Sequence, residues 1–186
     1  MRAETIRRMG TEGWLDLLAG GHPIPEDALA GREYRGVSLG LPGLLEKLTW
    51  KKFRKAFHRD ERTGALRGWN VRLEQDGLGA PDRPKRRGGE PFTFGHFRVV
   101  PLAGYALPGY RGRKLRVPAG RMLDYGMGGN GVDPIRFLRD PIVAVREGDA
   151  SLLFGWSYLD LGLRRVATPS FFTLELAGAV THVPAR

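Results

Sequence analysis

Alternating large and small side chains run through residues 151–176 (SLLFGWSYLDLGLRRVATPSFFTLEL), the longest stretch of the chain with a period of two. One row of its first half carries Phe154, Trp156 and Tyr158, and the alternation resumes after Gly162. Successive side chains of a strand point to opposite faces, and aromatic and β-branched residues favour strands. The stretch therefore predicts two long antiparallel strands joined by a turn at Gly162.

Shorter stretches with the same alternation lie between glycine- and proline-rich turns. They cover residues 29–39, 65–75, 91–102, 117–125 and 140–147. Strands that follow one another through mostly short turns are typical of an up-and-down barrel. We therefore predict a mainly β fold, a single antiparallel calycin- or lipocalin-like barrel of about seven or eight strands. A barrel of about eight strands is either filled by its own side chains or holds one small ligand.

Two segments have helical rather than strand spacing. Residues 3–18 predict one or two short helices, so we expect an N-terminal helical arm (residues 1–28) before the barrel domain (residues 29–186). Residues 44–57 predict one inserted helix, because Trp50, Phe53 and Phe57 recur at spacings of three and four. Its lysines would lie on the other face. The helix packs on the sheet or covers a pocket, or its basic face contacts an anionic partner.

Composition narrows the classes of function. The chain has no cysteine, which excludes disulfides and thiolate sites and agrees with a cytoplasmic location. Residues 1–20 lack the apolar core of a signal peptide, and no run reaches the ~18 apolar residues of a membrane span. The net charge of +10 favours anionic partners, although a basic surface also occurs without one. The basic loop 83–87 has no accompanying nucleic-acid motif.

Polar residues within rows of large apolar ones are the candidates for chemistry. His96 and Arg98 share the expected face of Phe94, and Asn70, Arg72 and Asp160 interrupt other rows. If these rows point inward, Phe94, Phe154, Trp156 and Tyr158 line a cavity in which Arg98 and His96 anchor a polar group. Period two cannot tell which face points inward.

His96 and Asp124 are the candidates for a general acid or base, since histidine titrates near neutral pH. A structural histidine, and an ion pair of Arg98 with Asp124 or Asp160, are the competing interpretations. We predict no metal and no cofactor: the four histidines are widely spaced, and the glycine-rich segment 126–131 lacks the patterns of a phosphate loop. That segment is better explained as a turn.

The segment that begins at Tyr34-Arg35-Gly36, with Gly43-Leu44-Leu45-Glu46 and Trp50-Lys51-Lys52-Phe53 after it, resembles the start of GXWXG-domain proteins. These are bacterial proteins with lipocalin-like strand patterns. Here Tyr34 stands at the family's tryptophan and Arg32 at its first glycine. The resemblance covers about a quarter of the chain and implies a barrel. It supplies no catalytic residues.

Three functions remain open. The first is a binding protein for an apolar or amphipathic small molecule, expected to be anionic because the surface is basic. The second is a barrel enzyme of the isomerase or cyclase type that uses His96 or Asp124. The third is a basic surface module for nucleic acid or acidic membrane, built on Lys51, Lys52, Arg54 and Lys55. The sequence does not settle the oligomeric state, the ligand or whether the protein is an enzyme.

Overall fold

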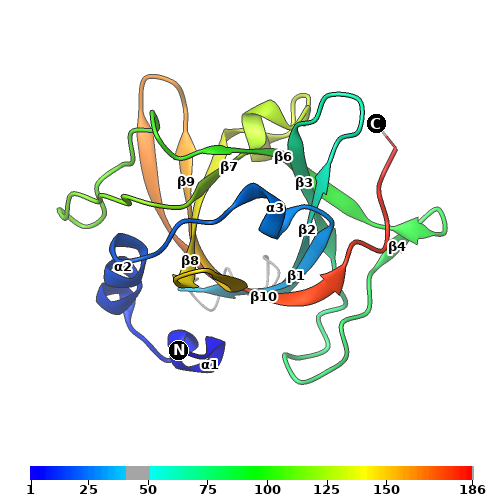
Figure 1. Cartoon of the computed structure of the whole chain (residues 1–186), viewed down its shortest axis with the longest axis horizontal. Coiled ribbons are helices and arrows are strands. Elements are labelled where there is room, and N and C mark those ends of the chain that lie inside the picture. Colours follow the sequence, from blue (N-terminus) through cyan, green and yellow to red (C-terminus); the bar gives the residue numbers. More distant parts are fainter. Residues whose placement is uncertain (41–50, 186) are drawn as a thin grey trace.

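The computed structural model describes residues 1–40 and 51–185. Eight antiparallel strands form one closed barrel in the order β1-β10-β9-β8-β7-β6-β3-β2 (Figure 1). Their bounds are β1 Arg32–Leu39, β2 Lys52–Arg59, β3 Leu66–Arg72, β6 Thr93–Pro101, β7 Arg121–Asp124, β8 Leu138–Arg146, β9 Asp149–Asp160 and β10 Arg165–Ala179. The predicted mainly β barrel is confirmed. Pairing of β1 with β10 closes it, so that the large strands leave no free edge.

Short elements complete the chain. Three α-helices precede the barrel, and the turns after β3 and β7 carry a small hairpin and two 3₁₀ helices. Their bounds are α1 Ala3–Arg7, α2 Thr11–Ala19, α3 Glu26–Leu29, β4 Arg86–Arg87, β5 Glu90–Pro91, η1 Tyr125–Met127 and η2 Pro134–Phe137. Helices within residues 3–18 were predicted, and α3 was not. Of the helices described, none is long and apolar enough to cross a bilayer.

The side chains that fill the barrel interior come from alternate positions of each strand. Rings from β2, β6, β10 and η1 all surround the ammonium group of Lys55, and strands so far apart in the sheet can meet only inside it. The same inner cluster contains Tyr34, Phe57, Leu153 and Leu174. The interior is therefore a packed core over part of its length.

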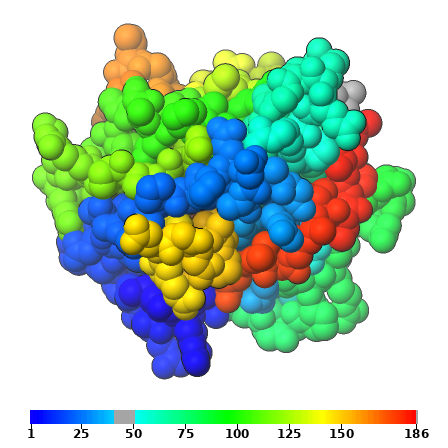
Figure 2. Space-filling model, viewed as in Figure 1, coloured from blue at the N-terminus to red at the C-terminus, as the bar shows by residue number. Residues whose placement is uncertain are grey.

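One end of the barrel is closed by the N-terminal segment. Ile24 and Leu29 are buried in the inner cluster, and α3 lies across this opening (Figure 1). In the space-filling view, atoms of the N-terminal region, coloured blue, cover the same face (Figure 2). Pairing of His22 with Ala144 of β8 attaches the segment to the barrel rim.

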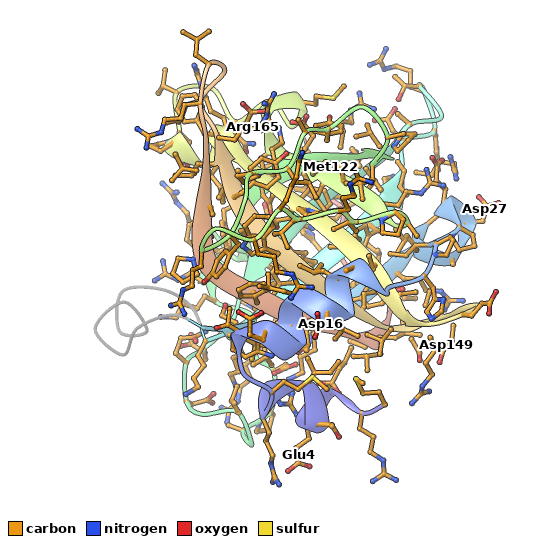
Figure 3. All side chains as sticks on the ribbon, turned by 90° about the vertical axis from the view of Figure 1, so that its left-hand side faces the viewer. Glu4, Asp16, Asp27, Met122, Asp149 and Arg165 are labelled. Atoms are coloured by element: carbon orange, nitrogen blue, oxygen red, sulfur yellow. The ribbon has the colours of Figure 1, made fainter. Side chains whose placement is uncertain are left out.

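A second apolar layer covers the outer face of the sheet. The helices α1 and α2 lie against β8, β9 and β10, and the segment after β6 crosses the same wall (Figure 3). Trp14 of α2 contacts Phe171 with ring centroids 5.2 Å apart, and Tyr110 contacts Phe171 at 5.6 Å. Phe154, Trp156 and Phe171 on the outward rows are therefore as fully buried as the side chains inside the barrel.

The predicted helix at residues 44–57 is wrong where the structure describes it. Residues 52–59 form β2, paired with β1 and β3. Positions 44–50 of that prediction, with Trp50, lie outside the described residues, as does the Gly43–Glu46 step of the GXWXG resemblance. Phe53 and Phe57 do share a face, but it is the inner face of a strand, because a spacing of four places residues together in a strand as well as in a helix.

Because of Tyr34 at the closed end, we expect the free energy of unfolding to vary with pH in the alkaline range. Burial raises the pKa of Tyr34 to about 12, whereas in the unfolded chain it is near 10. Between these values the unfolded state has lost a proton that the folded state keeps, so stability falls as pH rises. We expect the free energy of unfolding to fall about 1.4 kcal/mol per pH unit more steeply in the wild type than in Tyr34→Phe over this window. Urea titrations from pH 9 to 12 measure it, and parallel slopes would contradict it.

Candidate functional site

The open end of the barrel holds a buried lysine. Lys55 lies between Phe53 and Phe57 on the inward row of β2, and only 2% of it is exposed. Its Nζ donates hydrogen bonds to Oδ1 of Asn70 at 2.9 Å and to the hydroxyl of Tyr125 at 2.5 Å. Asp140 of β8 lies opposite, with Oδ2 3.3 Å from the ammonium group. Three strands and the 3₁₀ helix η1 thus contribute to one polar group inside the barrel.

Aromatic rings enclose this lysine on its remaining sides. The Nζ atom lies 5.2–5.3 Å from the centroids of four rings, those of Phe53, Phe97, Tyr125 and Phe172. Such distances allow cation–π attraction, which grows when the cation is desolvated. Two glycines make room for this packing: a Cβ at Gly36 would meet the Phe53 ring at 2.2 Å, and one at Gly155 would meet Phe172 at 2.3 Å.

Burial perturbs the titrating groups of the site. It lowers the pKa of Lys55, because an ammonium ion loses hydration in an apolar interior, and the adjacent Asp140 acts in the opposite direction. Burial and Asp140 both raise the pKa of Tyr125 well above its ordinary value, so its hydroxyl keeps its proton. The site therefore combines an amine that can become neutral with a phenol that remains a donor.

A cavity of about 270 Å³ opens beside these groups. Lys55, Asn70, Tyr125 and Asp140 line it together with apolar side chains such as Phe94 and Ile135. The space exists because the inward positions at this end are small: Ser38, Ser157, Thr168 and Ser170. At the closed end, the corresponding inward positions carry Phe57, Leu153 and Leu174 and fill the barrel.

One acceptor of the site is unsatisfied. Asp140 is 2% exposed, and its Oδ2 accepts from Lys55 and from the Tyr125 hydroxyl at 3.0 Å. Its Oδ1 is buried and has no hydrogen-bond donor in the described protein. Leaving a buried carboxylate oxygen without a donor is costly, and a molecule in the cavity that donated a hydrogen bond to Oδ1 would remove that cost.

Of the residues singled out in the sequence, Phe94 and Asn70 line this cavity. His96 and Arg98 do not, although regular alternation would place them on the side of Phe94. Gly95 adopts a φ of +53°, and the register of β3 with β6 shifts between Gly68 and Asn70. This bulge reverses the alternation, so His96 lies on the outer face near Trp69, with ring centroids 6.4 Å apart.

The row of Phe154, Trp156 and Tyr158 requires a correction. All three are fully buried, but they belong to the outer layer under α2 and the segment after β6, and they do not line the barrel interior. Trp156 donates from Nε1 to the carbonyl oxygen of Thr168 at 2.8 Å and contacts Tyr110 edge to face. The inward row of β9 consists of the smaller Leu153, Gly155 and Ser157.

Asp124 also lies on the outer face. Its carboxylate accepts from the Tyr105 hydroxyl at 2.6 Å and from the backbone N–H of Met127, and it pairs with Arg139 at 3.2 Å. Arg98 was the expected ion-pair partner of Asp124 or Asp160. In the structure Asp124 pairs with Arg139, and Asp160 pairs with Arg165. Catalytic roles for His96 and Asp124 stay predictions, and neither residue lines the barrel cavity.

The four basic residues proposed as a binding surface do not form one. Lys52 is 1% exposed and pairs with Asp76 at 2.6 Å, and Lys55 faces inward. Arg54 pairs with Glu33 at 2.9 Å. This leaves Lys51 as the exposed member of the group. The nucleic-acid and membrane alternative loses the surface on which it rested.

Sequence reasoning missed Lys55, Tyr125 and Asp140 as site residues. For Lys55 a signal existed: Phe53, Lys55 and Phe57 alternate at period two, with a charge in the middle of an aromatic row. Tyr125 is the first residue of η1, directly after β7, and Asp140 is the third residue of β8, close to its start. No local pattern distinguishes such positions from ordinary turn residues.

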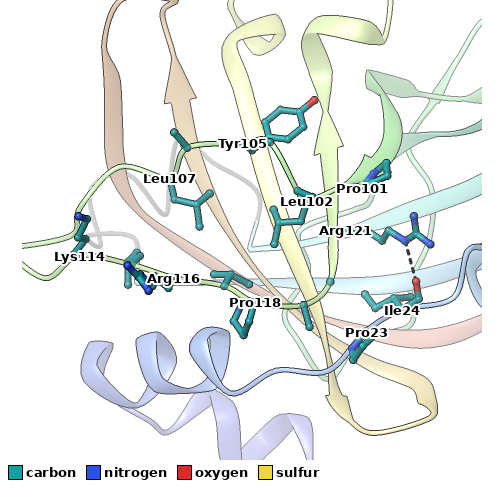
Figure 4. A pocket seen from close by; sticks show the side chains of 17 residues that line it. Pro23, Ile24, Pro101, Leu102, Tyr105, Leu107, Lys114, Arg116, Pro118 and Arg121 are labelled. Atoms are coloured by element: carbon teal, nitrogen blue, oxygen red, sulfur yellow. Dashed lines mark hydrogen bonds between the residues drawn. The ribbon is translucent and has the colours of Figure 1, made fainter.

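A larger hollow of about 780 Å³ lies on the outer surface (Figure 4). It is formed by residues 101–107 and 114–121 with Pro23 and Ile24, and its lining is mainly apolar. Arg121 at its edge is already engaged by the carbonyl oxygen of Ile24 at 2.9 Å and by Glu26 at 3.0 Å. Its other charged side chains, Lys114 and Arg116, are exposed to solvent, whereas the polar groups of the smaller barrel cavity are buried. The barrel cavity is therefore the better candidate site.

Among residues 1–40 and 51–185, no three carboxylate or imidazole groups gather as a possible metal site. Comparisons with protein-family models, with curated proteins and with solved structures gave no match. The resemblance to GXWXG-domain proteins stays a prediction. The function is therefore argued from the geometry of the barrel cavity.

Proposed function

We propose that the barrel binds a small, largely apolar molecule and holds its polar group with Lys55, Asn70, Tyr125 and Asp140. The observation that carries this proposal is the unsatisfied Oδ1 of Asp140 in a cavity whose lining surface is mainly apolar. Convergent polar groups in an apolar cavity are the usual anatomy of a small-molecule site.

The charges of the site favour a neutral ligand group. Lys55 and Asp140 offset one another at 3.3 Å, so the net charge of +10 on the whole chain does not extend into the cavity as a free cation. A group that donates to Asp140 and accepts from Lys55 suits the pair, and a hydroxyl does both. The expectation of an anionic ligand is replaced in this proposal by a hydroxyl or carbonyl compound.

The size of the cavity limits the ligand. Its volume of about 270 Å³ lies just below the ~300–1,000 Å³ typical of pockets for drug-sized molecules. The closed end is filled by Tyr34, Phe57 and Leu153, which leaves no channel for a long chain. Compounds of the size of a single aromatic ring with one polar substituent fit these limits better than fatty acids.

Binding is expected to depend on Lys55. In calorimetric titrations with benzyl alcohol, phenol and 1-hexanol, we expect Lys55→Met to weaken binding by about ten- to a hundredfold, the value of a hydrogen bond to a charged group. Lys52→Met is the matched control, because Lys52 is equally buried and ion-paired but on the outer face. Equal affinity in wild type and Lys55→Met would refute the site, as would failure of every probe to bind together with no ligand in native mass spectra of the purified protein.

A further inference from the structure

Lys55 is a primary amine that lines a ligand-sized cavity, and its neighbours are those that carbonyl chemistry requires. We propose that Lys55 forms a covalent imine with an aldehyde or ketone that enters the barrel. This inference rests on the proposed binding site and deepens it by naming the ligand class and the bond formed. It assigns to Lys55 the role of nucleophile, with Tyr125 and Asp140 as the groups that move protons.

The three reacting groups form a continuous chain. The Tyr125 hydroxyl lies 2.5 Å from Nζ of Lys55 and 3.0 Å from Oδ2 of Asp140. Asp140 Oδ2 is itself 3.3 Å from Nζ. A carbonyl carbon that approaches Nζ from the cavity places its oxygen within reach of the same hydroxyl. Asn70 fixes the amine from one side, and its own Nδ2 donates to the carbonyl oxygen of Gly95.

The surroundings make it easier for Lys55 to lose the proton that it must give up before its amine attacks. A buried lysine in apolar surroundings is the usual way in which proteins prepare imine formation. Burial lowers the pKa of Lys55, and Asp140 limits that shift. Tyr125 remains protonated because its pKa is raised, so it can act as an acid while Asp140 acts as the base.

The steps balance without a further reactant. The nitrogen lone pair of neutral Lys55 forms the C–N bond, and the carbonyl π pair moves to oxygen, which takes the proton of Tyr125. Asp140 removes a proton from nitrogen and returns it to the phenolate across their contact. A second proton from Tyr125 then releases the hydroxyl as water, and the nitrogen lone pair forms the C=N bond of an iminium. Asp140 takes the remaining N–H proton of the iminium and passes it to the Tyr125 phenolate, which leaves the imine. The sum is amine plus carbonyl to imine plus water.

The chain contains six lysines, which provide internal controls. Lys51 and Lys114 are exposed, and Lys52 is buried on the outer face in an ion pair with Asp76. Lys51 and Lys114 do not line the cavity in which Tyr125 and Asp140 can move protons. An aldehyde at neutral pH therefore distinguishes Lys55 from the exposed lysines by reactivity and from Lys52 by access.

The test is reductive trapping with benzaldehyde and cyanoborohydride at pH 7, followed by peptide mapping of the wild-type protein. We expect the benzyl group to concentrate on Lys55, to disappear from the intact mass of Lys55→Met and to persist in Lys52→Met. Tyr125→Phe is expected to slow trapping by about a hundredfold, the scale of general acid–base catalysis. Because Tyr125 also lines the binding cavity, trapping rates are compared at saturating benzaldehyde, so that weaker binding by Tyr125→Phe is not counted as slower proton transfer.

Three outcomes separate the claims. Benzyl concentrated on Lys55, with the variants as expected, supports the imine. If benzyl alcohol binds but labelling spreads over exposed lysines and spares Lys55, the imine is refuted and the binding site stands. If neither probe interacts with the barrel, the binding site is refuted as well. Mapping of the wild type decides between these outcomes even where a variant fails to fold.

Discussion

Replacing Asp140 with alanine is expected to destabilise the protein by about 3–5 kcal/mol, the cost of breaking a buried ion pair from one side. The substitution leaves the Lys55 ammonium inside the barrel without its counter-ion, and Asn70 and Tyr125 are neutral partners. Equilibrium unfolding in urea, followed by circular dichroism, measures the change. Asp160→Ala is the matched control: Asp160 pairs with Arg165 at 3.6 Å nearer the surface, where pairs contribute about 0–1 kcal/mol.

The double variant Lys55→Met/Asp140→Leu is expected to recover most of that loss, because a buried pair replaced by apolar side chains is often neutral or stabilising. It is also expected to lose benzyl alcohol binding. If Asp140→Ala costs no more than Asp160→Ala, the pair is not desolvated as the structure shows. If the double variant stays as unstable as Asp140→Ala, the pair stabilises the fold and gives no argument for a site.

The two ends of the barrel differ in a way that supports a functional role for the open end. Eight strands closed on themselves could be filled with apolar side chains from end to end, and the closed end is filled in this way. The open end instead holds a charged pair, an amide, a phenol and an unsatisfied carboxylate oxygen. A protein that carries desolvated polar groups of no benefit to stability has another use for them, and sites of perturbed pKa are where such use is found.

Much of the fold was predictable because period two is a strong signal over long strands. The hairpin of β9 and β10 and the strands near residues 65–75, 91–102 and 140–147 followed from alternation alone. The inserted helix failed for a definite reason. A spacing of four, as between Phe53 and Phe57, fits a helical face and a strand face equally, and only the intervening Lys55 distinguishes the two.

The candidate site was less accessible to sequence reasoning because alternation does not tell which row points inward. The sequence predicts that the aromatic row of β9 lines a cavity if that row points inward. In the structure it faces outward, because α2 and the segment after β6 form a second apolar layer over this wall. The bulge at Gly95 then reversed the facing of His96 relative to Phe94. Both effects are tertiary, and no local pattern encodes them.

Trp156→Ala tests whether Trp156 belongs to the outer layer or to the cavity lining, because the two placements predict different results. The ring is fully buried among Tyr110, Tyr158 and Phe171, so we expect a loss of about 3–5 kcal/mol in the free energy of unfolding. Its Nε1–H bond to the carbonyl oxygen of Thr168 is lost as well. Urea unfolding measures the loss, and Trp156→Phe, which keeps most of the apolar volume, should lose less.

Binding of benzyl alcohol shows whether the row of Phe154, Trp156 and Tyr158 faces the outer layer or the barrel cavity. Because Trp156 faces the outer layer, the folded Trp156→Ala protein should bind benzyl alcohol within about twofold of the wild type, at a temperature where both are folded. If the ring lined the cavity, the loss of a large apolar wall would weaken binding far more than that. A large drop in affinity without a drop in stability would place the ligand in the outer layer and refute the cavity at the open end of the barrel as its site. If Trp156→Ala lowers stability and leaves affinity unchanged, the result supports binding in the cavity lined by Lys55 and Asp140.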